Sequence, residues 1–101
     1  MRIEFRRSGG FAGLSVRLAL ESAELPAAER EALEALIARA DFFALPAARS
    51  RPRPDGFQYD LAIEHAGRRH ALCLHDPVEP EALRPLIERL TEMARAGGAR
   101  G

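Results

Sequence analysis

Hydrophobic and polar residues alternate in two segments near the start of the chain. In residues 2–6, Ile3 and Phe5 face one side, and in residues 14–20 aliphatic side chains occupy every second position. A period of two is that of a half-buried strand. Three glycines lie among residues 8–13 between the two segments, so we expect an antiparallel hairpin with a long, glycine-shaped loop.

The period changes to that of a helix after Leu25. Pro26 suits a first helical position, and one apolar stripe predicts a helix from about residue 26 to 40. Phe42 and Phe43 follow it and are expected to pack under its end, and the proline-containing residues 47–56 are predicted to form a loop. The members of the stripe are Leu33, Leu36, Ile37 and Ala40.

A second pair of alternating segments spans residues 57–64 and 68–75. A two-residue turn at Ala66 and Gly67 makes every pair of opposed residue numbers sum to 133, with Tyr59 facing Leu74. This register places both apolar sets on one face and sets Glu64 opposite Arg69 on the other, as a favourable charge pair. A slip of one residue would destroy that arrangement, so we expect this hairpin in this register.

The last segment carries a second helical stripe, and the pattern predicts that this helix ends before Gly97. Pro85 would forfeit a backbone hydrogen bond inside a helix that began at Pro80. The helix therefore either starts later than Pro80 or bends at Pro85. The stripe consists of Leu83, Leu86, Ile87, Leu90 and Ala94.

The order strand-strand-helix occurs twice, which predicts an α+β fold: a four-stranded antiparallel sheet with two helices packed on one face. A chain of 101 residues is about one small domain. We assign residues 1–95 to that domain and expect residues 96–101 to form a flexible C-terminal tail. No apolar run approaches the length of a membrane span, and a lone Cys73 cannot form an internal disulfide, so we expect a cytoplasmic location.

Three histidines, at positions 65, 70 and 75, are the first candidates for a metal site. In the predicted register His75 lies on the opposite face from the other two, so the three cannot bind one zinc ion. Cys73 is placed beside Asp60, whose charge would raise the pKa of the thiol and so disfavour a nucleophile. We expect no metal, no cofactor and no enzymatic activity.

The glycine-rich loop resembles a phosphate-binding loop, but it leads into a strand and lacks a helix N-terminus to bind the anion. Two interpretations of the loop remain open. Either the glycines present Phe11 outward to a partner, or Phe11 folds back over the edge of the sheet.

Arginines at positions 49, 51 and 53, together with Arg6, Arg7, Arg68 and Arg69, are candidates for a basic patch. All fifteen basic residues are arginines, but fifteen acidic residues bring the formal net charge to zero. Nucleic-acid-binding domains usually have a basic balance and stacking aromatic residues beside the charge. The composition therefore favours a solvated charge run over a nucleic-acid surface.

Several segments together resemble the emfourin family. They are the Ser-Gly-Gly-Phe-Ala-Gly loop of residues 8–13 with its flanking strands, Ala-Asp-Phe-Phe-Ala-Leu-Pro at residues 40–46, and Asp-Gly-Phe-Gln-Tyr at residues 55–59. Residues 80–86, Pro-Glu-Ala-Leu-Arg-Pro-Leu, are also similar to the last helix of that family. The resemblance extends over residues 1 to about 93.

The resemblance implies a small bacterial inhibitor of thermolysin- or protealysin-like zinc metallopeptidases, in which the zinc belongs to the target. We expect a monomer, with no nucleic acid and no membrane as partner. The alternative is a non-inhibitory protein-protein interaction module of the same fold. The expected partner-binding residues are Gly9, Gly10, Phe11, Ala12 and Gly13, with Arg51 and Arg53 in a second loop.

Overall fold

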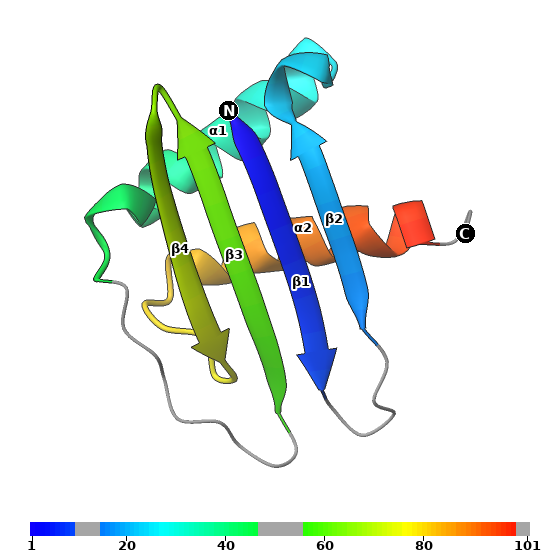
Figure 1. Cartoon of the computed structure of the whole chain (residues 1–101), viewed down its shortest axis with the longest axis vertical. Helices are drawn as coiled ribbons and strands as arrows, with labels where there is room; N and C mark the ends of the chain where they lie inside the picture. The colour runs from blue at the N-terminus through cyan, green and yellow to red at the C-terminus, as the bar shows by residue number, and fades with distance from the viewer. Residues whose placement is uncertain (10–14, 47–55, 99–101) are drawn as a thin grey trace.

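The computed structural model describes residues 1–9, 15–46 and 56–98. These residues form one four-stranded antiparallel sheet with both helices on the same face, which confirms the predicted fold class (Figure 1). The strand order across the sheet is β2-β1-β3-β4. The elements are β1 (Arg2–Gly9), β2 (Val16–Glu21), the 3-10 turn η1 (Ser22–Glu24), α1 (Ala27–Ala40), the 3-10 turn η2 (Phe42–Ala44), β3 (Phe57–His65), β4 (Arg68–His75) and α2 (Leu83–Gly98).

The register of the β3–β4 hairpin is the predicted one, with Tyr59 opposite Leu74 and Glu64 opposite Arg69. Ala66 and Gly67 both have positive φ, of 52° and 80°, as the two central residues of a type I′ turn require. The alternation of the two strands and the turn chemistry thus agree on one pairing.

The ion pair expected between Glu64 and Arg69 does not form, although the two residues are opposite each other. The Arg69 Nη1 atom instead donates to Glu4 Oε1 on β1 at 2.9 Å. The side chain of Ala62, which lies between β1 and β4 on β3, is small enough to let arginine reach across that strand. This bond holds the pKa of Glu4 below its usual value.

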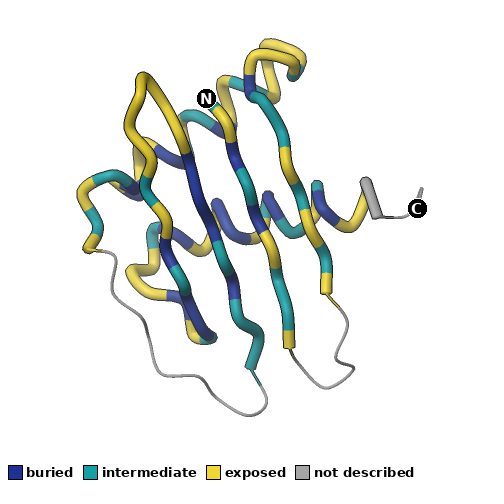
Figure 2. Tube along the Cα trace, viewed as in Figure 1, coloured by how far each residue is buried: buried dark blue, intermediate teal, exposed yellow. Residues whose placement is uncertain are grey.

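The hydrophobic core fills the space between the sheet and the helices. Its deepest side chains come from the middle of β1 and β3 and from the inward sides of α1 and α2 (Figure 2). None of the helices in the described part of the chain is long and apolar enough to cross a membrane. The largest side chains with under 2% exposure are Phe42, Ile3, Leu33, Leu61, Ile63, Leu83, Leu86 and Leu90.

The end of α1 is fixed by the aromatic residues that follow it, as the sequence predicts. Asp41 adopts a left-handed conformation with φ of 52°, and this reverses the chain so that Phe42 becomes 1% exposed. The ring of His70 lies edge-on to Phe42 at 5.4 Å, and its Nε2 atom is 2.6 Å from the carbonyl oxygen of Leu45. His70 is therefore a half-buried residue that fastens η2 to β4.

Helix α2 begins later than Pro80 and ends later than predicted. It starts at Leu83, so Pro85 lies in the first turn, where backbone N–H groups have no partner within the helix. The sequence pattern predicts an end before Gly97, but the helix continues through Gly98. Glycine lowers helix propensity by only about 1 kcal/mol per residue, so it does not by itself stop a helix.

We expect Leu90→Ala to lower the free energy of unfolding by about 2–5 kcal/mol, because it removes a fully buried side chain from the core and leaves a cavity. The matched control is Leu36→Ala, at a partly buried position of α1, with an expected loss of about 1 kcal/mol. Urea denaturation of both variants measures the difference. Equal losses would contradict the assignment of α2 to the centre of the core.

Candidate partner-binding surface

Both segments that the sequence assigns to partner binding attach to the same end of the sheet, here called the loop end. β1 ends at Gly9 and β2 begins at Val16 at this end, so residues 10–15 connect the two strands there. β3 also begins at this end, where Phe57 is paired with Gly9 (Figure 1). Of the predicted binding residues only Gly9 is described; those outside the described residues are Gly10, Phe11, Ala12, Gly13, Arg51 and Arg53.

Gly9 has a backbone conformation that explains why glycine stands there. Its φ is +85°, a value that residues with a side chain rarely adopt. A Cβ atom at this position would also lie 3.4 Å from the carbonyl oxygen of Gly56, the residue that precedes β3. Gly9 therefore lies directly against Gly56, where β1 ends and β3 is about to begin.

An aromatic ring and a guanidinium group form the base of the loop end. The Arg7 Cζ atom lies 4.3 Å from the centroid of the Phe57 ring, a distance typical of a cation–π interaction. The Arg7 Nε atom is buried and has no hydrogen-bond partner among the residues that the structure describes. Burying a donor without a partner costs free energy. The contact with the Phe57 ring stabilises the guanidinium group of Arg7.

Asp76 joins the end of β4 to the start of β3. Its Oδ2 atom accepts the backbone N–H of Phe57 at 3.1 Å, and its own N–H donates to the Phe57 carbonyl oxygen at 3.2 Å. The Tyr59 hydroxyl donates to Asp76 Oδ1 at 3.1 Å. Asp76 thus holds the backbone of Phe57 and the side chain of Tyr59 at the start of β3.

The surroundings of Tyr59 oppose ionisation of its hydroxyl. Burial, followed by the negative charge of Asp76 and the hydrogen bond to it, raises the pKa of Tyr59 to about 12. The Tyr59 ring lies with its centroid 6.3 Å from Phe5 on one side and 6.3 Å from Phe57 on the other. A continuous row of rings therefore connects the loop end to the core.

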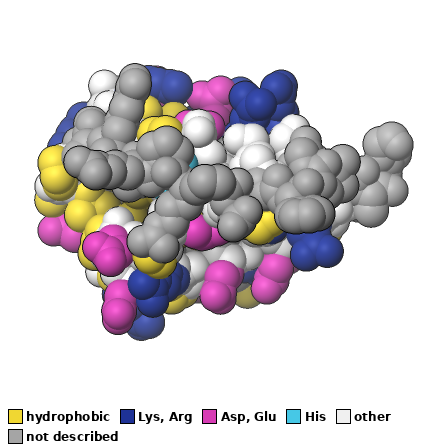
Figure 3. Space-filling model, turned by 90° about the horizontal axis from the view of Figure 1, so that it is seen from below, with side chains coloured by type: hydrophobic (Ala, Val, Ile, Leu, Met, Phe, Trp, Pro, Cys, Tyr) yellow, Lys and Arg dark blue, Asp and Glu magenta, His cyan; other side chains and the backbone are white. Residues whose placement is uncertain are grey.

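The surface of the loop end is mixed in character. Figure 3 views it directly and shows hydrophobic side chains gathered on one side, with arginine and acidic side chains around them. A hollow of about 200 Å³ lies beside it, lined by residues that include Tyr59, Asp76 and Arg84. Interfaces with proteins commonly combine apolar and polar surface in this way.

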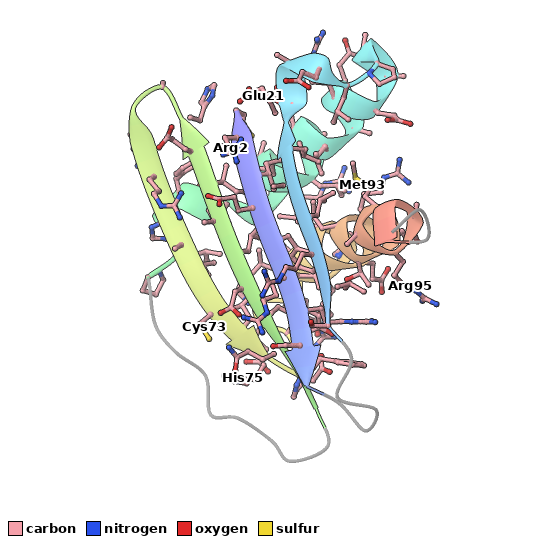
Figure 4. The ribbon with its side chains drawn as sticks, turned by 45° about the vertical axis from the view of Figure 1, so that its right-hand side comes forward. Arg2, Glu21, Cys73, His75, Met93 and Arg95 are labelled. Carbon is pink, nitrogen blue, oxygen red and sulfur yellow. The ribbon has the colours of Figure 1, made fainter. Side chains whose placement is uncertain are left out.

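The remaining chemical candidates do not come together. Cys73 and His75 project from the same face of β4 (Figure 4). The register places His65 and His70 on the other face, towards the helices. Within the described ranges, no group of three or more histidine, cysteine, aspartate or glutamate residues could hold a metal ion.

The described arginines of the candidate basic patch are divided between the two faces of the sheet. Arg7 and Arg68 stack on Phe57 and Phe43 on the helix face, while Arg6 and Arg69 line the open face. The patch that the sequence suggested is therefore not assembled from these four.

The sequence did not identify Arg7 and Asp76 as parts of this end, and it assigned Phe57 and Tyr59 to the core. Tyr59 is indeed buried, but Phe57 is only partly so. The alternation of β3 predicts which face a side chain occupies and not how far the helices cover that face. The strand ends at the loop end project beyond α2 (Figure 1).

We expect the phenol of Tyr59 to titrate with a midpoint near pH 12 in the folded protein. Because the pKa is above its ordinary value of 10, the unfolded state loses this proton first. The contribution of Tyr59 to the free energy of unfolding is therefore complete below pH 10 and is lost as the pH rises to about 12. Tyr59 is the single tyrosine and there is no tryptophan, so phenolate absorbance reports this group alone.

Asp76→Asn should move that midpoint down towards 10, because it removes the negative charge. The matched control Glu79→Gln, at an exposed position, should leave it unchanged. A midpoint that Asp76→Asn leaves unchanged, in a variant with a native circular dichroism spectrum, would show that the Tyr59–Asp76 contact is absent in solution.

Comparison with known proteins identifies the family. The family model of emfourin matches residues 5–91. No curated protein and no solved structure matches the chain. Since the matched region covers most of the 101 residues, the chain belongs to the emfourin family.

Proposed function

We propose that this protein inhibits a thermolysin- or protealysin-like zinc metallopeptidase by binding its active-site cleft with the loop end. The observation that carries the proposal is the match to the emfourin family over residues 5–91, because emfourins are inhibitors of such peptidases. The inhibitor needs no metal of its own, since the zinc ion belongs to the target. It is a binding protein and not an enzyme, and it acts as a cytoplasmic monomer.

The proposed anchor is the segment from Gly9 to Gly13, with Phe11 at its centre. Thermolysin-type peptidases favour a bulky apolar side chain beside the scissile bond, and Phe11 fills that requirement. The described part of the structure supports this role because Gly9 lies at the end of a strand paired on both sides. A rigid scaffold reduces the entropy lost when a loop binds, and so increases affinity.

The second proposed contact is the segment that contains Arg51 and Arg53. It enters β3 at Phe57, one strand away from Gly9, and adjacent strands are about 4.8 Å apart. A partner that covers the first segment is therefore within reach of the second. Prolines at positions 52 and 54 restrict the unbound backbone and lower the cost of ordering this segment.

We expect Phe11→Ala to weaken inhibition by about 2 kcal/mol or more, a roughly 30-fold rise in the inhibition constant, as for an aromatic interface anchor. The assay is hydrolysis of a fluorogenic peptide by a thermolysin-type peptidase at increasing inhibitor concentration. Phe11→Leu is the matched control and should stay close to wild type, because it keeps an apolar side chain. Arg51→Gln combined with Arg53→Gln tests the second segment.

Full inhibition by a folded Phe11→Ala protein would show that the first segment is not the anchor. A wild-type protein that forms a stable complex without slowing hydrolysis would instead support the alternative function, a non-inhibitory interaction module. Size-exclusion chromatography of the mixture, run beside the activity assay, distinguishes these outcomes.

A further inference from the structure

Strand β2 forms one edge of the sheet, and no strand is paired with its outer side among the described residues. Proteins usually protect such an edge with a proline, a bulge or a lysine, because an unpaired edge can bind another strand. β2 contains neither proline nor lysine, and its pairing with β1 is continuous, without a bulge. Its charged residues, Arg17 and Glu21, flank a central Leu-Ala-Leu segment. The edge is therefore open to a further strand.

One hydrogen bond fixes which backbone groups of β2 point outward. The N–H of Ser22 donates to the Met1 carbonyl oxygen at 2.8 Å, so these two residues form a hydrogen-bonded pair. Along an antiparallel ladder such pairs alternate with pairs that are not hydrogen-bonded. Every second residue before Ser22 therefore turns its N–H and C=O groups towards β1. The residues that turn theirs outward are Arg17, Ala19 and Glu21.

Helix α2 crosses the helix side of β2 and continues beyond it (Figure 1). Figure 4 shows Met93 and Arg95 on this projecting part of the helix. Leu18 and Leu20, on the helix side of β2, are only partly buried. An added strand would lie about 4.8 Å farther out than β2 and above the projecting end of α2. Apolar side chains on its helix side would complete the burial of both leucines.

A second copy of the chain does not fit this edge. Antiparallel pairing of two identical strands requires a two-fold axis perpendicular to the sheet, so both copies would carry their helices on the same side. Pairing centred on Ala19 would match Arg17 with Glu21 of a second copy. However, α2 crosses the middle of β2 and projects past it (Figure 1), so the two projecting helix ends would occupy the same space. The edge instead fits a single extended segment.

Arg17 determines the charge that this segment should carry. It lies opposite Arg6 on β1, in a pair without backbone hydrogen bonds, where side chains are closest and like charges destabilise the sheet. Arg6 has Asp60 opposite it on its other side, whereas Arg17 has no ion-pair partner among the described residues. A carboxylate opposite Arg17 on the added strand would give each arginine one acidic neighbour. Glu21 needs no such partner, because it is paired with the Met1 amino group at 2.7 Å.

We propose that the outer edge of β2 binds an extended segment of a partner protein as a fifth, antiparallel strand. The segment has an acidic residue opposite Arg17 and apolar residues opposite Leu18 and Leu20. Antiparallel pairing lets each outward residue of β2 exchange two hydrogen bonds with one residue of the segment. The site is distinct from the loop end, goes beyond the proposed inhibition and is tested without a peptidase.

The probe is the blocked peptide Ser-Thr-Val-Thr-Val-Glu-Val-Ser, titrated into the isotope-labelled full chain. When its glutamate is opposite Arg17, its second threonine is opposite Ala19 and its valines lie on the helix side. In the free protein the amide of Ala19 should exchange with solvent quickly and those of Leu18 and Leu20 slowly. The peptide should slow exchange at Arg17, Ala19 and Glu21.

Methylated peptides test the hydrogen bonds of the added strand. A methyl group on the backbone nitrogen of the second threonine should abolish binding, because that N–H donates to Ala19. A methyl group on the nitrogen of the following valine is the matched control and should not, because that nitrogen points away from β2. Replacing the glutamate by glutamine should weaken binding about two- to fivefold, and Arg17→Gln should remove this difference.

Ala19→Pro removes an outward N–H and keeps the bonds to β1, so it should fold and no longer bind the peptide. The matched control is Ala71→Pro, at an exposed position of the opposite edge strand β4, which should bind like wild type. The methylated peptides decide the question if Ala19→Pro does not fold.

Four results would each overturn the proposal. They are equal binding of the two methylated peptides, uniform exchange along β2 in the free protein, no change at millimolar peptide, and a dimer of the free protein that Ala19→Pro dissociates.

Discussion

The antiparallel pairing of β1 with β3 joins two separate hairpins into one sheet, and every surface of the molecule depends on it. On the helix face it sets Ile3 against Ile63 and Phe5 against Leu61, which makes the core continuous across the two hairpins. At one end it sets Gly9 against Phe57 and so brings both candidate binding segments together. On the face away from the helices the same pairing sets Glu4 against Ala62 and Arg6 against Asp60.

The pattern of hydrophobic residues along the chain was sufficient to predict the two hairpins and the apolar stripes of the two helices. The register of β3 with β4 follows from alternation and from Ala66 and Gly67, whose positive φ values suit a two-residue turn. The strand order does not follow in the same way, since alternation shows which residues share a face and carries no information on which hairpin edges meet. The C-terminal end of helix α2 could not be predicted from the sequence either, because Gly97 and Gly98 are tolerated in a helix.

The candidate site, too, could be predicted from the sequence only in part. The sequence and the family resemblance placed the binding residues in two loops, but only Gly9 among them is described, and its φ of +85° agrees with a directing role. The supporting contacts were missed because each depends on distance in space. Arg7 reaches Phe57 from the neighbouring strand, and Asp76 reaches Phe57 and Tyr59 from the end of β4. No spacing along the chain indicates such contacts.

Two consecutive arginines lie in different surroundings, which the formal net charge of zero does not reveal. At the loop end Arg7 is partly buried against Phe57 and lies close to the Tyr59–Asp76 pair. Arg6, its neighbour in sequence, is exposed on the opposite face of the sheet, because side chains alternate along a strand. One arginine therefore supports the loop end, and the other faces solvent.

We propose that the loop end is the surface that meets a metallopeptidase. Hydrogen exchange of the backbone amides, compared between the free protein and its complex with a thermolysin-type peptidase, is the decisive measurement. We expect slower exchange in the complex at the strand ends around Gly9, Val16, Phe57 and Asp76, with α1 unchanged. Slower exchange on α1 or α2, with no change at the loop end, would contradict it.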